Sequence, residues 1–355
     1  MKKAVLEKRL INSYRLKIKA LIENEKDEYL LCSYYNDLSI LDALEEYQID
    51  GRCFIQSDDF SKKSLQDVSC LTQFEEFYDD IQTFERKRNL IPGFEVGDIA
   101  TIKNTREDIL VFVFDFFQQF DKNYSRILNK IYNYNRNNII FSKHRSVTFS
   151  LSYNQGYFIN VEKNNSIEEY INGVHEFSHA IADYIKLRYY TDSTYPFIEI
   201  LPLFVEANAL EYLGYLVPEY REDVYTYKKS TLLTLLNMAR KLIYQHDFYA
   251  GSYTSNKLLG IISTMLKNHK SYSFSRDALE GSVNEKYMYL ISYLVVIELL
   301  SCNDFELAKH RLNKIIESNE LNNYILFLYD MGINLNEHSS EYIESIRDNK
   351  KIIRY

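Results

Sequence analysis

Apolar and polar residues recur with a helical period over most of the chain. Near the N-terminus, the apolar positions between residues 3 and 24 fit one face of an amphipathic helix. The same period predicts helices over 37–48, 72–90 and 106–135. From about Ser166 to the C-terminus the pattern is again helical. Its breaks are expected near residues 191–196, 217–222, 250–256, 268–284 and 331–338.

The pattern changes at residue 139, where β-branched and aromatic residues come in near alternation. We expect strands at about 146–153 and 157–162, with the letters NQG at 154–156 in the position of a hairpin turn. This segment therefore predicts a small antiparallel sheet beside the helix that follows it.

Residues that form turns are scarce, with 10 Gly and 4 Pro among 355 residues. A β-sandwich or β-barrel needs many turns, so the composition favours a mainly α-helical protein. The length corresponds to one large domain or two ordinary ones. We place an N-terminal helical region at 1–135 and a second region, which includes the sheet and all later helices, at 136–355.

Charge and hydropathy argue against several classes of protein. The formal net charge is −8 and the pI is about 5.5, whereas a surface that binds phosphates normally has a basic excess. We therefore expect no nucleic-acid partner. No run of 18 apolar residues predicts a membrane span, and charges recur too often near the N-terminus for a signal peptide. The 4 cysteines form no CxxC pair, which is typical of reduced thiols in a cytoplasmic protein.

One short motif carries chemistry. The letters VHEFSHA at 174–180 contain HExxH, and on a helix His175 and His179 share one face, so both imidazoles can reach one metal ion. Glu176 can then take a proton from an activated water, and zinc suits imidazole and carboxylate ligands. Random placement gives only roughly 0.01 such motifs in a chain of this composition. A helix with solvent-facing His and Glu and no metal stays open as an alternative.

A third ligand is expected from the apolar segment at 195–214. Glu199 comes 20 residues after His179, which leaves room for a loop and a returning helix. Glu206 follows two turns later on the same face, whereas Glu211 is out of phase with both. A carboxylate among apolar residues is costly unless it is paired, protonated or bound to a metal. We expect Glu199 to be the ligand and Glu206 to support a ligand histidine. The reverse assignment, and two surface glutamates on an amphipathic helix, stay open.

Three blocks of the sequence resemble the oligoendopeptidase F and thimet oligopeptidase family of zinc metallopeptidases, a group of gluzincins. The block GYFINVEKNNSIEEYINGVHEFSHA at 156–180 is similar to that family's edge strand, turn and zinc helix. The block EILPLFVEANALEYL at 199–213 is similar to its second zinc helix, in which a ligand Glu is followed seven residues later by another Glu. The block GSVNEKYMYLISYLVVIEL at 281–299 resembles its Tyr-rich segment.

The resemblance, which spans about 156–300, implies a helical zinc-peptidase fold and a role for individual residues. One zinc ion per chain would be bound by His175, His179 and Glu199. Glu176 would be the general base. Tyr289, and less directly Tyr287, would donate a hydrogen bond to the developing oxyanion. In a chain with 32 Tyr, ordinary helix packing is an equally simple role for these two.

The chain also departs from that family. Ser178 stands where the family usually has Gly, and the stretch 275–289 contains no counterpart of the catalytic His that precedes the family's tyrosines. The nearest upstream histidine is His269. The chain is much shorter than typical members, which implies a reduced N-terminal half and a more open cleft.

We therefore predict a zinc-dependent peptidase that hydrolyses short peptides, with the strand at 157–162 as the edge strand that pairs with extended substrate. Two alternatives stay open: a degenerate homologue that keeps zinc but binds peptides or a partner without turnover, and a helical interaction protein with a coincidental HExxH. The remaining histidines are expected at the surface, and only His246 warrants a check for proximity to the metal. They are His144, His246, His269, His310 and His338.

Overall fold

The computed structural model describes residues 12, 15, 16, 18–26, 77–92, 96–151, 156–189, 197–249, 283–318 and 324–349. The chain divides into two compact units. The first contains residues 1–62, 98–192 and 201–224, and the second contains residues 63–97, 193–200 and 225–355. The boundary that the sequence predicted at residue 135 falls inside the first unit. The predicted helix at 37–48 lies outside the described residues, and the described part of the one at 3–24 is helical.

Two helices replace the single one predicted for 106–135. Helix α4 spans Arg106–Phe120 and helix α5 spans Lys122–Asn135. Asp121 separates them because its backbone is extended and its side chain accepts hydrogen bonds from the first backbone N–H groups of α5. Thr105 and Asp108 form a capping box at the start of α4. The 3₁₀ helix η2, Arg136–Asn138, then leads into the sheet.

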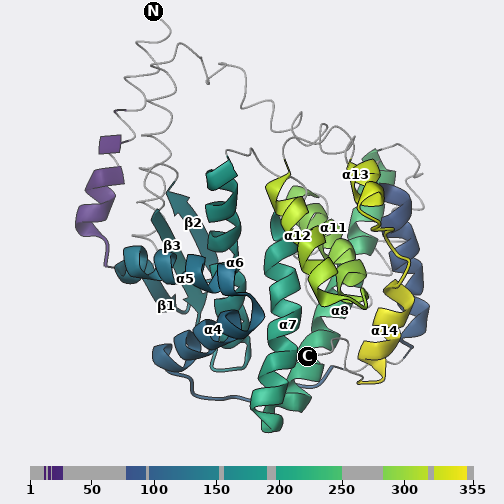
Figure 1. Cartoon of the computed structure of the whole chain (residues 1–355), viewed down its shortest axis with the longest axis horizontal. Helices are drawn as coiled ribbons and strands as arrows, with labels where there is room; N and C mark the ends of the chain where they lie inside the picture. The colour runs from purple at the N-terminus through teal and green to yellow at the C-terminus, as the bar shows by residue number, and fades with distance from the viewer. Residues whose placement is uncertain are drawn as a thin grey trace, which may run out of the picture. The chain divides into compact units, whose positions relative to one another are not determined.

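The sheet has three strands among the described residues, in the order β1-β3-β2 (Figure 1). They are β1 at Ile139–Ser142, β2 at Val147–Leu151 and β3 at Gly156–Glu162. Strand β3 pairs antiparallel with β2 and parallel with β1. The sheet is therefore mixed, and the prediction of a purely antiparallel sheet was wrong because β1 was missed. The strand at 157–162, predicted at the edge, lies in the centre, and β2 is an outer strand.

Helix α6, Glu168–Tyr189, contains the HExxH motif and packs against β2, β3, α4 and α5. Its buried face includes Val174, Phe177 and Ile181, which are fully enclosed. A glycine permits the close approach to α4: a Cβ added at Gly173 would lie 3.0 Å from a methyl carbon of Ile109. The fold thus holds the motif helix rigidly against both the sheet and its neighbouring helices.

Helix α7, Ile200–Leu216, is the second long helix of the site and is apolar on almost every face. Such a pattern is typical of a helix buried on all sides. Tyr212 joins it to α4, because its ring lies against Phe112 and Phe116 and its hydroxyl donates a hydrogen bond to Asp115. Burial raises the pKa of the Tyr212 hydroxyl, and the hydrogen bond to Asp115 raises it further. The 3₁₀ helix η4, Pro218–Tyr220, follows at the predicted break.

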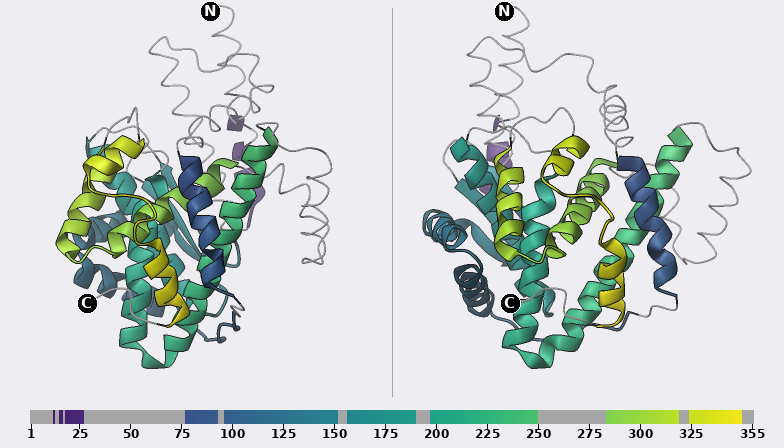
Figure 2. Two further views of the ribbon diagram at one scale, coloured as in Figure 1. Left: turned by 90° about the vertical axis from the view of Figure 1, so that its right-hand side faces the viewer. Right: turned by 45° about the vertical axis from the view of Figure 1, so that its right-hand side comes forward.

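The second unit is helical in its described part. Residues 77–86 form a helix that continues into the 3₁₀ helix η1, Lys87–Leu90. The other elements are η3 at Phe197–Glu199, α8 at Arg221–Tyr249, α11 at Val283–Leu300, α12 at Phe305–Glu317, α13 at Tyr324–Asp330 and α14 at Ser339–Arg347. Helix α11 is buried from Leu290 to Leu300 and contacts η3, α12 and α14. Figure 2 shows α14, in yellow, beside the helix at 77–90, and contacts with η1 support this placement.

No helix in the described ranges is long and apolar enough to cross a membrane. Cys302, the one cysteine within those ranges, is a free thiol with partial exposure. The fold is therefore mainly α-helical with a small sheet beside the HExxH helix, as the sequence predicted.

Candidate metal centre

The two histidines of the motif face each other across one turn of α6. The Nε2 atoms of His175 and His179 are 3.2 Å apart, and their ring centroids are 4.9 Å apart. Both residues are partly exposed. Phe177 and Ser178, which lie between them in the sequence, are buried. Ser178, at the family's usual Gly position, donates a hydrogen bond to the Val174 carbonyl, so its hydroxyl is satisfied within the helix.

This imidazole pair fits a zinc ion. Two nitrogens that each lie ~2.05 Å from a tetrahedral zinc are about 3.3 Å apart. The observed 3.2 Å between the Nε2 atoms matches that separation. Two unprotonated imidazole nitrogens at this distance repel each other unless a cation or a proton lies between them. The spacing of the two imidazole nitrogens is therefore compatible with a shared zinc ion.

Glu206 contacts one of the histidines. Its Oε2 lies 3.0 Å from His175 Nδ1, and the two side chains are only 7% and 16% exposed. A carboxylate at Nδ1 favours the tautomer with hydrogen on that atom, in which Nε2 carries the lone pair that a metal would bind. The sequence pointed to this glutamate through its apolar surroundings. It did not reveal which histidine Glu206 would contact.

Glu199 is the last residue of η3 and directly precedes α7. The sequence placed it on a returning helix, whereas the helix proper begins one residue later. His175, His179 and Glu199 each offer a ligand atom, and these atoms lie within 4.8 Å of one another. Glu199 precedes Glu206 by about two helical turns, so one segment supplies both a candidate ligand and the carboxylate that contacts His175.

Glu176 is held on the sheet side of α6. Only 5% of this residue is exposed, and its Oε2 accepts a hydrogen bond of 2.8 Å from the hydroxyl of Thr148 on β2. The same hydroxyl lies 2.8 Å from the backbone carbonyl of Glu176. Sequence reasoning missed Thr148, because a threonine in a strand is unremarkable until the helix that crosses it is placed.

The two predicted tyrosines belong to α11 in the second unit. Tyr287 is 1% exposed, and its ring lies 6.2 Å from that of Phe77. Tyr289 is partly exposed and its ring lies 6.5 Å from that of Tyr293. Within this unit Tyr287 is therefore a packing residue, and Tyr289 has the greater access to solvent. Their roles in chemistry stay predictions.

A second group of possible ligands in the described chain is explained by helix packing. Glu298, Glu337 and His338 also bring ligand-type atoms within 4.8 Å of one another. Glu298 accepts hydrogen bonds from the Nδ1 and the backbone N–H of His338, just before α14 begins. Burial raises the pKa of Glu298, and the hydrogen bond that the His338 ring donates to Glu298 raises the pKa of His338. Lys87 adds a positive charge beside Glu298. These contacts fasten α11 to α14.

Of the other histidines, His338 is partly exposed, and its ring contacts Glu298. His310 is exposed and His144 is partly exposed. The side chain of His246 and the whole of His269 lie outside the described residues.

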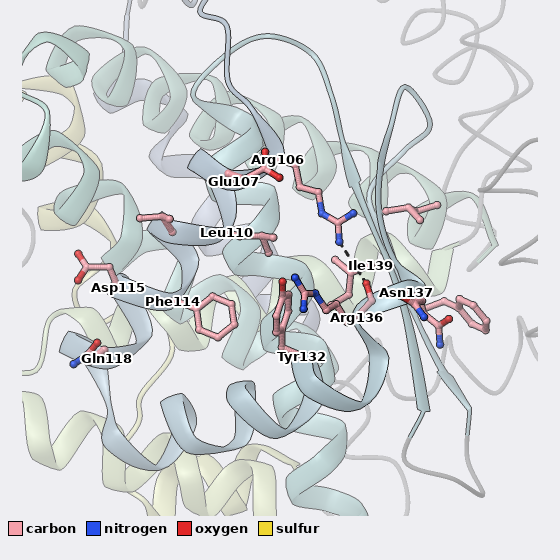
Figure 3. A pocket seen from close by; sticks show the side chains of 14 residues that line it. Arg106, Glu107, Leu110, Phe114, Asp115, Gln118, Tyr132, Arg136, Asn137 and Ile139 are labelled. Atoms are coloured by element: carbon pink, nitrogen blue, oxygen red, sulfur yellow. Dashed lines mark hydrogen bonds between the residues drawn. The ribbon is translucent and has the colours of Figure 1, made fainter.

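A cavity of about 950 Å³ lies elsewhere in the first unit, between α4, η2 and β1. Figure 3 shows Asp115 and Gln118 at one end of it and Asn137 at the other. The guanidinium of Arg106 reaches the Arg136 carbonyl at 3.4 Å within this cavity. None of the residues that line it comes from α6 or α7, so it is separate from the candidate metal centre.

Comparison with known proteins supports the fold. No protein-family profile and no curated protein matches the sequence. Solved structures do match. One is a protein assigned as an oligoendopeptidase F from Bacillus anthracis str. Ames, with a TM-score of 0.52 at 13% identity over 92% of this chain. Another is a PZ peptidase A with an inhibitor, with a TM-score of 0.52 at 10% identity over 96% of this chain. A third is a protein assigned as a peptidase from Chlamydophila abortus, with a TM-score of 0.52 at 12% identity over 97% of this chain.

The chain spans 63% of the Bacillus anthracis protein, 68% of the PZ peptidase and 63% of the Chlamydophila abortus protein. At 10–13% identity the likeness concerns the fold and leaves the activity to be tested. The resemblance found in three sequence blocks is confirmed at that level: this chain has the helical fold of oligoendopeptidase F-type peptidases.

Proposed function

We propose that this protein is a zinc-dependent peptidase that hydrolyses peptide bonds in short peptides. The observation that carries the proposal is the cluster of His175, His179 and Glu199, whose ligand atoms lie within 4.8 Å of one another. Glu176 follows His175 directly on the same helix, and the fold is shared with peptidases. A coincidental HExxH on an interaction protein gives no reason for a third ligand to converge there.

His175, His179 and Glu199 would hold the zinc through two imidazole nitrogens and one carboxylate oxygen. When bound, zinc supplies a Lewis acid that lowers the pKa of a coordinated water and polarises a substrate carbonyl. Glu206 would keep the hydrogen of His175 on Nδ1, so that the lone pair of Nε2 could coordinate the ion.

Glu176 would move the protons of the reaction. Its carboxylate accepts a proton from the attacking water and then passes that proton to the departing amine nitrogen, as the C–N bond breaks. Tyr289 would donate a hydrogen bond to the oxygen that becomes negative during the attack. The stretch before α11 has no histidine that could provide a second donor, so we expect hydrolysis to be slower than in a site that has one.

Strand β2 offers a place for the substrate backbone. It is an outer strand of the described sheet, and its Thr148 contacts Glu176. An extended peptide added to that edge would lie next to the general base. This assigns to β2 the docking role that the sequence had assigned to the strand at 157–162.

The test is a cleavage assay on a library of short unstructured peptides. Wild-type protein should cleave some of them, and Glu176→Gln should keep its zinc but lose about 10² to 10⁴ in rate, because an amide cannot accept the water's proton. Tyr289→Phe should lose less, on the order of 10²-fold, since the zinc remains. Glu107→Gln, an exposed change on α4, is the control and should behave as wild type.

A wild-type protein that carries zinc yet cleaves no peptide would support the other candidate, a non-catalytic zinc-binding homologue that binds peptides or a partner. The missing histidine in the stretch 275–289 is the observation that keeps this candidate open.

A further inference from the structure

Thr148 makes the hydrogen bonds that fix the position of Glu176. Its hydroxyl lies 2.8 Å from Glu176 Oε2 and 2.8 Å from the Glu176 backbone carbonyl oxygen. A threonine hydroxyl has one hydrogen, so it can donate to only one of these oxygens at a time. The carbonyl already accepts a bond from the backbone N–H four residues later within α6. The ionised carboxylate is the stronger acceptor because it is charged, so it accepts the hydrogen bond from the Thr148 hydroxyl.

The carboxylate is otherwise unanchored in the described part of the chain. Glu176 is 5% exposed, and Thr148 provides the one side-chain hydrogen bond that its carboxylate makes there. With Oε2 held by Thr148, Oε1 is the oxygen that remains for the water. A glutamate has three rotatable side-chain bonds, so without this anchor its carboxylate would sample several orientations.

Strand geometry makes Thr148 a rigid support. It is the second residue of β2 and is paired with Ile159 of the central strand β3, which is itself paired with β1. Helix α6 packs across β2 and β3. The anchor of the carboxylate is thus set by the sheet and not by a loop, which is how a reactive group is kept within a narrow range of positions.

We infer that Thr148 is a positioning residue for the general base: it presents one oxygen of Glu176 to the water and holds the other. The expected effect on kcat rests on the proposed peptidase function. The position of the Glu176 carboxylate can be measured in a crystal structure whether or not the protein is active.

The experiment compares the full-length wild type with Thr148→Val, which keeps the shape and removes the hydroxyl, and Thr148→Ser, which keeps the hydroxyl. Thr148→Ala replaces Thr148→Val if the latter does not fold. Ser142→Ala is the control, because it removes a hydroxyl that makes a 2.8 Å bond within the same sheet, to Asn160. Crystal structures, zinc content, kcat and KM are determined for each.

In the crystal structures, the Glu176 carboxylate should leave its wild-type position in Thr148→Val and keep it in Thr148→Ser and Ser142→Ala. In the kinetics, kcat of Thr148→Val should fall about 10- to 100-fold, the range typical for loss of a supporting hydrogen bond in a metal site, with KM and zinc content unchanged. Thr148→Ser should restore most of kcat.

An unmoved Glu176 carboxylate in Thr148→Val would overturn the inference, as would an unchanged kcat in an active protein. A fall in zinc content equal to the fall in kcat would also overturn it, because it would indicate a general structural role. If the wild type cleaves nothing, the proposed function fails, and the crystal structures still decide whether Thr148 positions Glu176.

Discussion

Removing the charge of Glu206 should weaken zinc binding without unfolding the site. Its Oε2 lies 3.0 Å from His175 Nδ1, and both side chains are largely shielded from water, so solvent screens the contact little. Loss of a hydrogen-bonding partner behind a metal ligand typically costs 10- to 100-fold in metal affinity, or about 1.4 to 2.8 kcal/mol. Glu206→Gln keeps an oxygen that can accept the bond and loses only the charge, so we expect about 10-fold. Glu206→Ala loses both, so we expect about 100-fold.

The assay is competition for zinc with a chelator of known affinity, at fixed pH and ionic strength. Glu211→Gln is the matched control, since Glu211 is 6% exposed on the same helix but out of phase with Glu206. Its zinc affinity should stay within twofold of wild type. An unchanged affinity in Glu206→Ala would refute the supporting role. A loss far beyond 100-fold would mean that Glu206 is itself a ligand, which reverses its assignment with Glu199.

Two further changes test the packing and the pH dependence of the fold. A Cβ at Gly173 would crowd methyl groups 3.0 and 3.1 Å away, whereas one at Gly214 meets its nearest atom at 3.7 Å. In urea unfolding, the free energy of unfolding of Gly214→Ala should therefore rise by up to about 1 kcal/mol, because Ala has the higher helix propensity. That of Gly173→Ala should be lower than that of Gly214→Ala by about 1 to 3 kcal/mol. Equal free energies of unfolding in the two variants would contradict the close packing at Gly173. The hydrogen bond that His338 donates to Glu298 raises the pKa of His338 in the folded state, so its stabilising effect is complete below the unfolded pKa of about 6.5 and is lost as the pH rises through the folded value. The difference in Tm between wild type and His338→Gln should accordingly shrink from pH 6 to pH 9, and a difference that grows would contradict this sign.

Local patterns in the sequence predicted the helices better than the sheet. The helical period located α6 and α7 and the break at η4, because each depends on residues close together in sequence. It missed the interruption at Asp121, where one side chain ends a long apolar pattern by capping α5. It also missed β1, whose four residues pair in parallel with β3 some 20 positions later. Such pairing leaves no local signal.

The residues of the candidate site also divide into those that a local sequence pattern indicates and those that only the folded structure reveals. The spacing of His175 and His179 on one helix required only the helical period, and the structure has both on α6. Glu206 was indicated by a carboxylate in an apolar stretch, which must have a partner. Thr148 could not be identified from the sequence, because its contact with Glu176 exists only once β2 and α6 pack against each other. The placement of Glu199 one residue before α7 depends on where that helix begins, and the ends of helices are the part that a sequence pattern locates least well.

The zinc content of the intact protein tests the central claim most directly. Native mass spectrometry of the chain, purified without chelator and without added metal beyond equimolar zinc, should show one zinc per chain. His179→Ala should show none under the same conditions, because two ligands cannot hold the ion, and Glu176→Gln should still show one. A metal-free wild type, or a His179→Ala variant that retains its full zinc, would contradict the account of this centre.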